Sequence, residues 1–416
     1  MPTITVVIPN FNHGHLIEES VLSTFEQSVP PDEIIIVDDG STDDSIPRIR
    51  KLEEKIPSVR LIPLSKNQGA IRAGNLGAKE AKSEIIFFRS ADDLLLQDSI
   101  SFAQQAFRQT PQAHLAFGEI LFFQNEIESG TKETLALSNE TKFFSSSELL
   151  DIWLPDFNLP EPACFVRKSS LMALGGLKEE AKWYSGWLCF TSIALAHGLA
   201  FIPKPITAFR LSPDSYGTSN LRNTEIQRPV LRFLIREVMN YDEGLRQKFI
   251  DSGAFGIFGS QLKELIEKEA DSLPKNSHLL LDKSHSDSHL HQLPRHGIPG
   301  VITRRLEEMQ NVPSFMEAVR TSKILVYGAG SQTSFLLRIW KSLGLPRISG
   351  IIVTERKGLE KFEGFHVQNL ESVSECETTM IVLSSKSFEA EMSSNLDEKL
   401  PSAKKLSFWI KQFTKL

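Results

Sequence analysis

The stretch EIIIVDDGSTDDSIPRIRKLEEKIPSVRLIPL, residues 33–64, joins two short aliphatic runs through a segment with a different period. The runs at 33–39 and 59–64 have the length and β-branched composition of buried strands. Between them, apolar residues recur every three or four positions over residues 45–56, which is the spacing of one helix face. A strand, a helix and a second strand predict a βαβ unit, because parallel strands need a crossover connection of this kind.

The same alternation continues on both sides of this unit. Further strands are expected at 4–9 and 84–88, with helices at 15–28 and 70–82. Repeated βαβ units predict an α/β fold with a largely parallel sheet up to about residue 110. Residues 111–215 have a more mixed pattern, with a helix expected from Trp187 to His197 and strands in the segments AHLAFGEILFF, ACFVRK and AFIPKPITAFRL.

The remainder of the chain divides into a helical segment and a second α/β domain. The pattern is helical from Glu225 to about Leu273, and the polar stretch at 275–300 reads as a linker or long surface loop. A second βαβ pattern begins near residue 320. We therefore predict three parts, at 1–220, 221–319 and 320–416. Five of the ten histidines lie in the polar stretch, and their irregular spacing without cysteine favours a solvated loop over a metal site.

Composition and charge exclude several functions. The formal net charge of −6 provides no general basic field for nucleic acid. Three scattered cysteines do not suggest a disulfide framework, which fits a reducing compartment. No basic segment precedes a long apolar run, and nowhere do 18 apolar residues follow one another. We therefore expect a cytoplasmic protein without a cleaved signal or a membrane span, and peripheral contact with the inner face of the membrane stays open.

Acidic residues follow two of the expected strands directly. Asp38 and Asp39 end the second strand, and Asp92 and Asp93 follow the fourth. Each acid alone would be read as a turn former or a helix N-cap. The carboxyl ends of parallel strands share one edge of a sheet, however, and like charges that converge there repel unless a cation or a donor-rich ligand lies among them. The pattern predicts a ligand site at this edge.

The motifs VVIPNFNHG, IIIVDDGSTDDS and NQGAIRAGNLGAKEAKSEIIFFRSADDLL resemble, in order, spacing and residue type, the family 2 glycosyltransferases of the GT-A fold. The resemblance covers about residues 1–220. It implies a mixed GT-A sheet and a site for a nucleotide-diphospho-sugar, with Pro9 and Phe11 lining the nucleotide pocket, Asp39 accepting a hydrogen bond from the base, and Arg72 and Asn75 facing the diphosphate or sugar. The full set of donor-binding residues implied by the resemblance is Pro9, Phe11, Asp38, Asp39, Arg72, Asn75, Asp92 and Arg210.

The resemblance also implies a divalent cation. Residues 90–92 correspond to the DxD motif, whose last aspartate, here Asp92, binds Mg²⁺ or Mn²⁺ bridging the diphosphate. The first position of the motif is Ser90, so one carboxylate fewer faces the cation, and Asp93 is the expected second ligand. A nucleoside diphosphate leaves readily only when its developing charge is neutralised, which a hard cation on carboxylates achieves.

The usual catalytic base of the family is missing from its expected place. That acid begins a helix downstream of the DxD motif, and just before Trp187 the sequence has Gly186. Three other acids are candidates for the base, although each also reads as an ordinary surface residue: Glu161, Glu180 and Asp214.

The C-terminal motif VYGAGSQTSFLL, residues 326–337, places Gly328 and Gly330 in a strand-to-helix turn, and Thr333 replaces the third glycine of G-x-G-x-x-G. Glu355 follows the next expected strand, where a ribose-binding acid would lie. The segment resembles small Rossmann-like nucleotide-binding domains. No Tyr-x-x-x-Lys pair follows, so redox chemistry is not expected, and nucleotide binding and a packing or homo-oligomeric role both remain open.

The resemblance implies a metal-assisted, inverting glycosyltransferase that uses a UDP-, GDP- or dTDP-linked sugar. The acceptor would be a glycan, a lipid-linked molecule or a protein, and the resemblance implies a role in cell-surface polysaccharide biosynthesis. The alternative is a nucleotide-sugar-binding or scaffold protein that keeps the fold but lacks transfer activity because of Gly186. A third reading adds a nucleotide-dependent enzyme in the C-terminal domain.

Overall fold

The structure of the protein is a computed structural model. Its chain forms two compact units, Met1–Ser286 and Asp287–Leu416. The residues that the structure describes are 1–124, 126–127, 130–133, 137–138, 140–152, 159, 161–211, 224–282, 317, 319–328, 333, 336–337, 340, 345–354, 361–362, 365–373, 379–383, 399 and 404–407.

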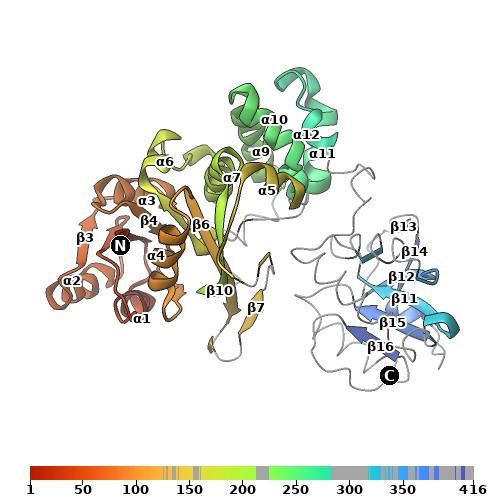
Figure 1. Ribbon diagram of the computed structural model, residues 1–416, viewed down its shortest axis with the longest axis horizontal. Coiled ribbons are helices and arrows are strands. Elements are labelled where there is room, and N and C mark those ends of the chain that lie inside the picture. Colours follow the sequence, from red (N-terminus) through yellow and green to blue (C-terminus); the bar gives the residue numbers. More distant parts are fainter. Residues whose placement is uncertain are drawn as a thin grey trace. The chain divides into compact units, whose positions relative to one another are not determined.

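The first unit is built on one mixed sheet (Figure 1), with strand order β3-β2-β1-β4-β9-β6-β10-β5. The four strands expected near the N-terminus pair in parallel, which confirms the predicted βαβ units. They and their connecting helices are β1 (Ile4–Asn10), α1 (Gly14–Phe25), β2 (Glu33–Asp38), α2 (Ser45–Lys55), β3 (Val59–Pro63), α3 (Ala70–Glu80) and β4 (Ile85–Phe88).

The second half of the sheet is mixed rather than parallel. β9 lies antiparallel between β4 and β6, and β6 and β10 run parallel to each other. The short strands β7 and β8 pair with β6 and β10. The elements of this half are β5 (Leu94–Leu95), α4 (Ser99–Gln109), β6 (Leu115–Phe123), β7 (Thr131–Glu133), β8 (Lys142–Phe144), α5 (Ser146–Ile152), β9 (Cys164–Arg167), α6 (Lys168–Ala173), α7 (Ser185–His197) and β10 (Leu199–Arg210).

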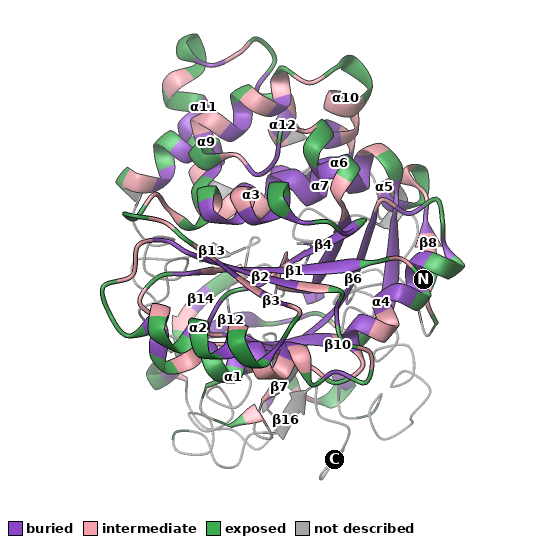
Figure 2. Cartoon of the chain, turned by 90° about the vertical axis from the view of Figure 1, so that its left-hand side faces the viewer, coloured by how far each residue is buried: buried purple, intermediate pink, exposed green. Residues whose placement is uncertain are grey.

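Helices cover both faces of the sheet. Figure 2 shows α3 and α7 on one face and α1 and α2 on the other. Side chains alternate along a strand, so in β1 Val7 joins the core beneath α3 and α7, while Val6 and Ile8 join the core beneath α1, α2 and α4. This explains why the strands read as continuous aliphatic runs, since neither face is solvated.

A further helical layer covers α7 from outside. It consists of α9 (Thr224–Met239), α10 (Glu243–Ser252), α11 (Gly259–Glu269) and α12 (Leu279–Asp282). Trp187 of α7 is fully buried, and its ring lies 5.1 Å from that of Phe258 and 5.5 Å from that of Phe255, measured between ring centroids. The sequence pattern set residues 221–319 apart as their own segment, whereas helices α9 to α12 share the core of the first unit.

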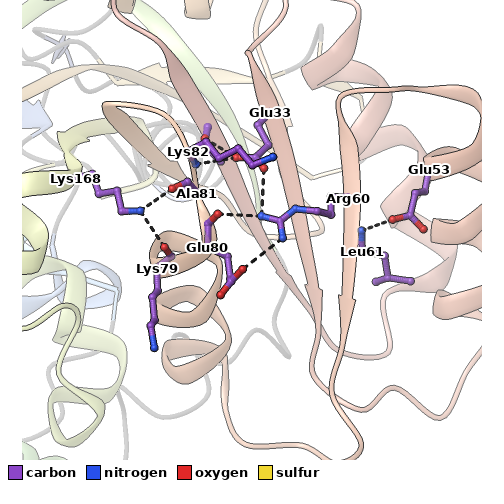
Figure 3. Close-up of polar contacts among 10 residues, drawn as sticks. Glu33, Glu53, Arg60, Leu61, Lys79, Glu80, Ala81, Lys82 and Lys168 are labelled. Atoms are coloured by element: carbon purple, nitrogen blue, oxygen red, sulfur yellow. Dashed lines mark hydrogen bonds and ion pairs between the residues drawn. The ribbon is translucent and has the colours of Figure 1, made fainter.

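Polar contacts hold the C-terminal end of α3 at the amino edge of the sheet (Figure 3). Arg60 of β3 donates to the carboxylate of Glu33 at 3.2 Å and to the carbonyl of Glu80 at 3.0 Å. The Lys168 ammonium donates to the carbonyls of Lys79 at 2.9 Å and Ala81 at 2.6 Å. Cations satisfy the free carbonyls at a helix C-terminus and interact favourably with its dipole. The N-terminus of α3 accordingly faces the opposite edge, where β1, β2 and β4 end.

The second unit contains a smaller sheet of order β13-β14-β12-β11-β15-β16. Its described strands pair in parallel except for β13 with β14, which agrees with the expected second α/β domain. Their bounds are β11 (Lys323–Tyr327), β12 (Gly350–Val353), β13 (Lys361–Phe362), β14 (Phe365–Asn369), β15 (Thr379–Leu383) and β16 (Lys404–Ser407). Among the helices that the structure describes, none has the length and apolar character needed to cross a bilayer.

Candidate active site

The carboxyl edge of the first sheet gathers the residues singled out in the sequence. β1 lies between β2 and β4, so the loops that follow these three strands are neighbours. The Asp39 N–H donates to the Asn10 carbonyl at 2.8 Å, and the Arg89 N–H donates to the Val7 carbonyl at 3.0 Å. Phe11, in the loop after β1, leaves 39% of its surface exposed.

Asp38 holds the turn after β2 together. Its carboxylate accepts from the Asn10 amide at 2.8 Å, from the Ser41 N–H at 2.9 Å and from the Ser41 hydroxyl at 2.7 Å. The side chain is fully buried. Within the folded chain, these contacts make Asp38 a turn former.

Asp39 joins the same turn to the N-terminus of α3. Its two carboxylate oxygens accept from the backbone N–H groups of Gln68 and Gly69, each at 2.7 Å. A carboxylate is favoured at a helix N-terminus, where N–H groups are free and the dipole is positive. Gly40, with φ +75°, lets the two loops touch, because a Cβ there would lie 2.5 Å from the carbonyl carbon of Lys66. The nucleotide end of the predicted site is thus a pair of interlocked loops.

Arg72 and Asn75, on the first turns of α3, have different surroundings. The Asn75 side chain donates to the Leu177 carbonyl and accepts from the Leu177 N–H, both at 2.8 Å, so its amide fastens α3 to the loop before α7. Arg72 keeps about half of its side chain exposed and pairs with Glu179 at 3.0 Å. An exposed ion pair of this kind contributes little to stability, which leaves the guanidinium available to an anionic ligand.

Asp92 and Asp93 separate at the exit of β4. Asp92 is half-buried, whereas Asp93 is 1% exposed and accepts from the Arg210 N–H at 2.9 Å. Arg210, at the end of β10, also donates through Nε to the Asp92 carbonyl at 2.9 Å, and its guanidinium lies over the Phe123 ring. Burial, followed by the charge of Asp92, raises the pKa of Asp93 to about 7. Asp92 thus stays partly accessible after β4, while Asp93 is buried and binds the backbone of Arg210.

Arg89 directly precedes this turn and was not predicted from the sequence as a functional residue. It is 2% exposed and donates to the Ser20 carbonyl and hydroxyl and to the Ser23 hydroxyl on α1. Burial lowers the pKa of Arg89 to about 10, against the opposing effect of the Asp93 and Asp92 charges. A buried cation here offsets part of the repulsion between the two carboxylates.

The described residues contain no group of three or more His, Cys, Asp or Glu side chains arranged for a metal ion. Mg²⁺ commonly takes one or two protein carboxylates and completes its shell with substrate phosphates and water. A single half-buried carboxylate such as Asp92, at an edge where a diphosphate would lie, fits that mode of binding. A closed, all-protein metal cage does not.

The base candidates divide clearly. Glu180 is exposed, and Asp214 lies outside the described residues. Glu161 begins the 3₁₀ turn Glu161–Ala163, directly before β9, and its carboxylate accepts from the Trp187 N–H in the first turn of α7. Desolvation raises the pKa of Glu161 to about 8, and the Trp187 N–H opposes that rise.

One further acid was missed in the sequence. Glu119 of β6 is 2% exposed, and its strand register places it opposite Pro205 of β10. The signal was an acid inside the otherwise apolar run LAFGEILFF.

In the second unit, Gly328 follows β11 with φ +119° and donates its N–H to the Ile352 carbonyl at 2.8 Å, while Gly330 and Glu355 lie outside the described residues.

Comparison with solved structures identifies the fold of the first unit. A crystal structure of TarS residues 1–349 from S. aureus in complex with UDP-GlcNAc aligns with a TM-score of 0.50 at 16% identity, over 77% of this chain and 85% of that one. A second TarS crystal structure aligns with a TM-score of 0.50 at 18% identity, over 67% and 50% of the two chains. The mixed sheet of the first unit has the GT-A architecture.

The sequence comparisons point to a family for part of the chain. Residues 5–174 match the model described as glycosyl transferase family 2. Similar proteins include an uncharacterized glycosyltransferase of Haemophilus influenzae, 35% identical over 24% of this chain and 40% of its own length. A putative teichuronic acid biosynthesis glycosyltransferase of Bacillus subtilis, TuaG, is 34% identical over 24% of this chain and 39% of its own. The matches thus span well under half of these relatives.

Proposed function

We propose that the protein transfers a sugar from a nucleotide-diphospho-sugar to an acceptor hydroxyl, with a divalent cation, Mg²⁺ or Mn²⁺, assisting at Asp92. The observation that carries the proposal is the half-buried Asp92 carboxylate at the sheet edge shared with Asp39 and the N-terminus of α3. This arrangement lies within the family 2 domain. An anionic diphosphate there would meet a cation site on one side and the positive end of the α3 dipole on the other.

The nucleotide would bind over the loops that end β1 and β2. The exposed Phe11 ring and Pro9 offer an apolar surface to the base, and the buried Asp39 carboxylate is held at the rim of this surface. The donor would be linked to UDP, GDP or dTDP. UDP is favoured as the first candidate because the TarS structure with a TM-score of 0.50 contains UDP-GlcNAc.

The diphosphate would lie between Asp92 and α3. A cation bound there would neutralise the charge that develops on the leaving nucleoside diphosphate. The Arg72 guanidinium, half exposed on the first turn of α3, would contact the diphosphate or the sugar. Arg210 holds the Asp92 carbonyl and the Asp93 carboxylate, so it keeps the ligand-binding turn in position. A single displacement at the anomeric carbon would invert its configuration.

The acceptor would be a glycan, a lipid-linked molecule or a protein in cell-surface polysaccharide biosynthesis. This part of the proposal draws on two relatives, the teichuronic acid enzyme and a glucosyltransferase of Campylobacter jejuni whose name includes an undecaprenol-linked glycan. Such an acceptor would bring the protein to the inner face of a membrane. The C-terminal unit would then serve nucleotide binding or self-association, as its sequence motif suggests.

The test offers the full chain UDP-glucose, UDP-GlcNAc, GDP-mannose and dTDP-glucose with Mn²⁺ or Mg²⁺, and measures release of free nucleotide. We expect cation-dependent release from one of these donors, reduced at least 100-fold by Asp92→Asn. Asp44→Asn, at an exposed position on the same loop system, is the matched control and should behave as wild type. Absence of turnover with every donor, together with equal UDP affinity in Asp92→Asn and wild type, would refute the proposal.

Binding of UDP without turnover would instead favour the alternative, a nucleotide-sugar-binding protein without transfer activity. Gly186 favours this alternative, because the family's usual acid is absent from that position.

A further inference from the structure

We propose that Glu161 is the general base of this transferase, and that position 186 is glycine because the Glu161 carboxylate occupies the space of the acid usually carried there. This inference rests on the proposed transferase function and names the group that completes it. A general base must lie within reach of the acceptor hydroxyl in the bound complex, and its pKa must then suit proton transfer.

The space at the start of α7 is filled by Glu161. A Cβ built on Gly186 would lie 2.1 Å from Glu161 Oε2, 2.9 Å from its Cδ and 3.4 Å from its Cγ. With C–C and C–O bonds of about 1.5 and 1.2 Å, an aspartate at this position would hold its own oxygens about 2.4 Å from that Cβ. The Glu161 carboxylate therefore lies within the reach of the missing acid's carboxylate, and no side chain at 186 can coexist with it in this conformation.

The first turn of α7 forms a hydrogen bond to the Glu161 carboxylate. The Trp187 N–H, one of the free donors in the first turn of α7, donates to Glu161. The chain enters α7 through Lys182, whose φ of +49° and ψ of −124° are rarely adopted by residues other than glycine. Strained backbone of this kind persists where surrounding contacts demand it, and it is common near functional sites.

The strand pairing brings Glu161 to the edge that holds Asp92. β9 pairs antiparallel with β4, with Phe165 opposite Phe87, so the residues that enter β9 run beside those that leave β4. The Thr207 hydroxyl donates to the Pro162 carbonyl at 2.6 Å, and Arg210, three positions further along β10, binds the turn at Asp92. One strand thus fixes the base candidate and the cation-binding turn relative to each other.

The surroundings of Glu161 suit a base that is ionised at mildly alkaline pH, around 8. The titratable groups that interact with it are the thiols of Cys164 and Cys189 and the hydroxyl of Tyr184, and burial raises the pKa of all three. These neighbours are uncharged at neutral pH, so desolvation governs Glu161 and raises its pKa to about 8. A carboxylate with a raised pKa is a stronger proton acceptor than an exposed one.

The proposed step balances as a direct displacement. The acceptor hydroxyl gives its proton to the Glu161 carboxylate while its oxygen bonds to the anomeric carbon. The bond from that carbon to the diphosphate oxygen breaks, and its electron pair leaves with the nucleoside diphosphate. Glu161 later returns the proton to solvent.

The experiment compares Glu161→Gln with Glu180→Gln and with Glu243→Gln, an exposed acid on α10, in the full chain with the panel of four donors and Mn²⁺. Nucleotide release, with water or an added glycan as acceptor, gives kcat, and titration with UDP and Mn²⁺ gives the affinity. We expect Glu161→Gln to lower kcat at least 100-fold with UDP affinity within about twofold, and the other two variants to match wild type. A Glu161→Gln kcat within about threefold of wild type would overturn the assignment.

A second variant decides the matter if Glu161→Gln does not fold. The double substitution Glu161→Ala with Gly186→Asp moves the carboxylate back onto α7. Recovery of at least a tenth of wild-type kcat, against none for Glu161→Ala alone, would support the shared position of the two acids. A folded double variant that binds UDP but has no turnover would overturn it. If wild type itself releases no nucleotide from any donor, the transferase function fails, and this inference fails with it.

Discussion

Replacing Glu161 by glutamine should stabilise the folded protein at alkaline pH and change little at acid pH. In the folded chain, burial raises the pKa of this carboxyl to about 8 from the ordinary 4.5. Between these two values the unfolded chain has released the proton while the folded chain retains it. The stability that this retained proton contributes is fully present below pH 4.5, and it is lost as pH rises toward 8.

The size of the effect follows from these two pKa values. Each pH unit in which only the unfolded chain is ionised costs the folded state about 1.4 kcal/mol. Between pH 5 and pH 9, the free energy of unfolding of wild type should therefore fall by about 4 kcal/mol relative to that of Glu161→Gln. All other titrating groups are common to the two proteins, so their contributions cancel in the comparison.

Urea unfolding at pH 5, 7 and 9, in the absence of nucleotide and metal, measures this difference. Tryptophan fluorescence is a suitable signal, because Trp187 lies beside the carboxyl and is fully buried. Glu243→Gln should show no pH-dependent difference from wild type. A difference between Glu161→Gln and wild type that stays within about 1 kcal/mol from pH 5 to pH 9 would refute the reasoning, because it would mean that the folded chain solvates this carboxylate.

Two further substitutions test how the site is held. Asn75→Ala should lower the free energy of unfolding by about 1–3 kcal/mol in urea titrations, because it leaves the Leu177 N–H and carbonyl without their side-chain partner; a loss below about 0.5 kcal/mol would show that water replaces the amide. Gly40→Ala should weaken UDP binding by at least tenfold in calorimetric titration, since φ +75° and the 2.5 Å approach to Lys66 force the two loops apart, and unchanged affinity would contradict the interlocked arrangement.

Local patterns were sufficient for the first half of the sheet. Strand and helix periods, together with turn residues such as those at 38–43, act over a few neighbouring positions, so β1 to β4 and α1 to α3 could be predicted from them. The mixed second half was harder to place. β9 joins strands β4 and β6 in an antiparallel arrangement, and that choice depends on pairings between residues about 50 to 80 positions apart, such as Phe87 with Phe165.

The individual roles of the site residues depended still more on distant contacts. Asp38 and Asp39 are adjacent residues of the same type. The Asp38 carboxylate accepts hydrogen bonds within its own turn, whereas the Asp39 carboxylate accepts from the N–H groups of residues 68 and 69. Asp92 and Asp93 are adjacent, but only the second is fully buried, and it accepts from the Arg210 N–H. Asn75 was expected to face the diphosphate or sugar, and its amide is engaged by Leu177, about 100 positions away.

The sequence alone was enough to identify a family 2 domain with acids at the ends of parallel strands, because motif order and short-range periodicity are properties of the chain itself. It also showed that Gly186 stands where an acid was expected. Only the folded chain shows that the Glu161 carboxylate occupies the space that a side chain at position 186 would need. The reason is physical: a carboxylate 25 positions earlier in the sequence reaches the first turn of α7 only after β9 has paired beside β4.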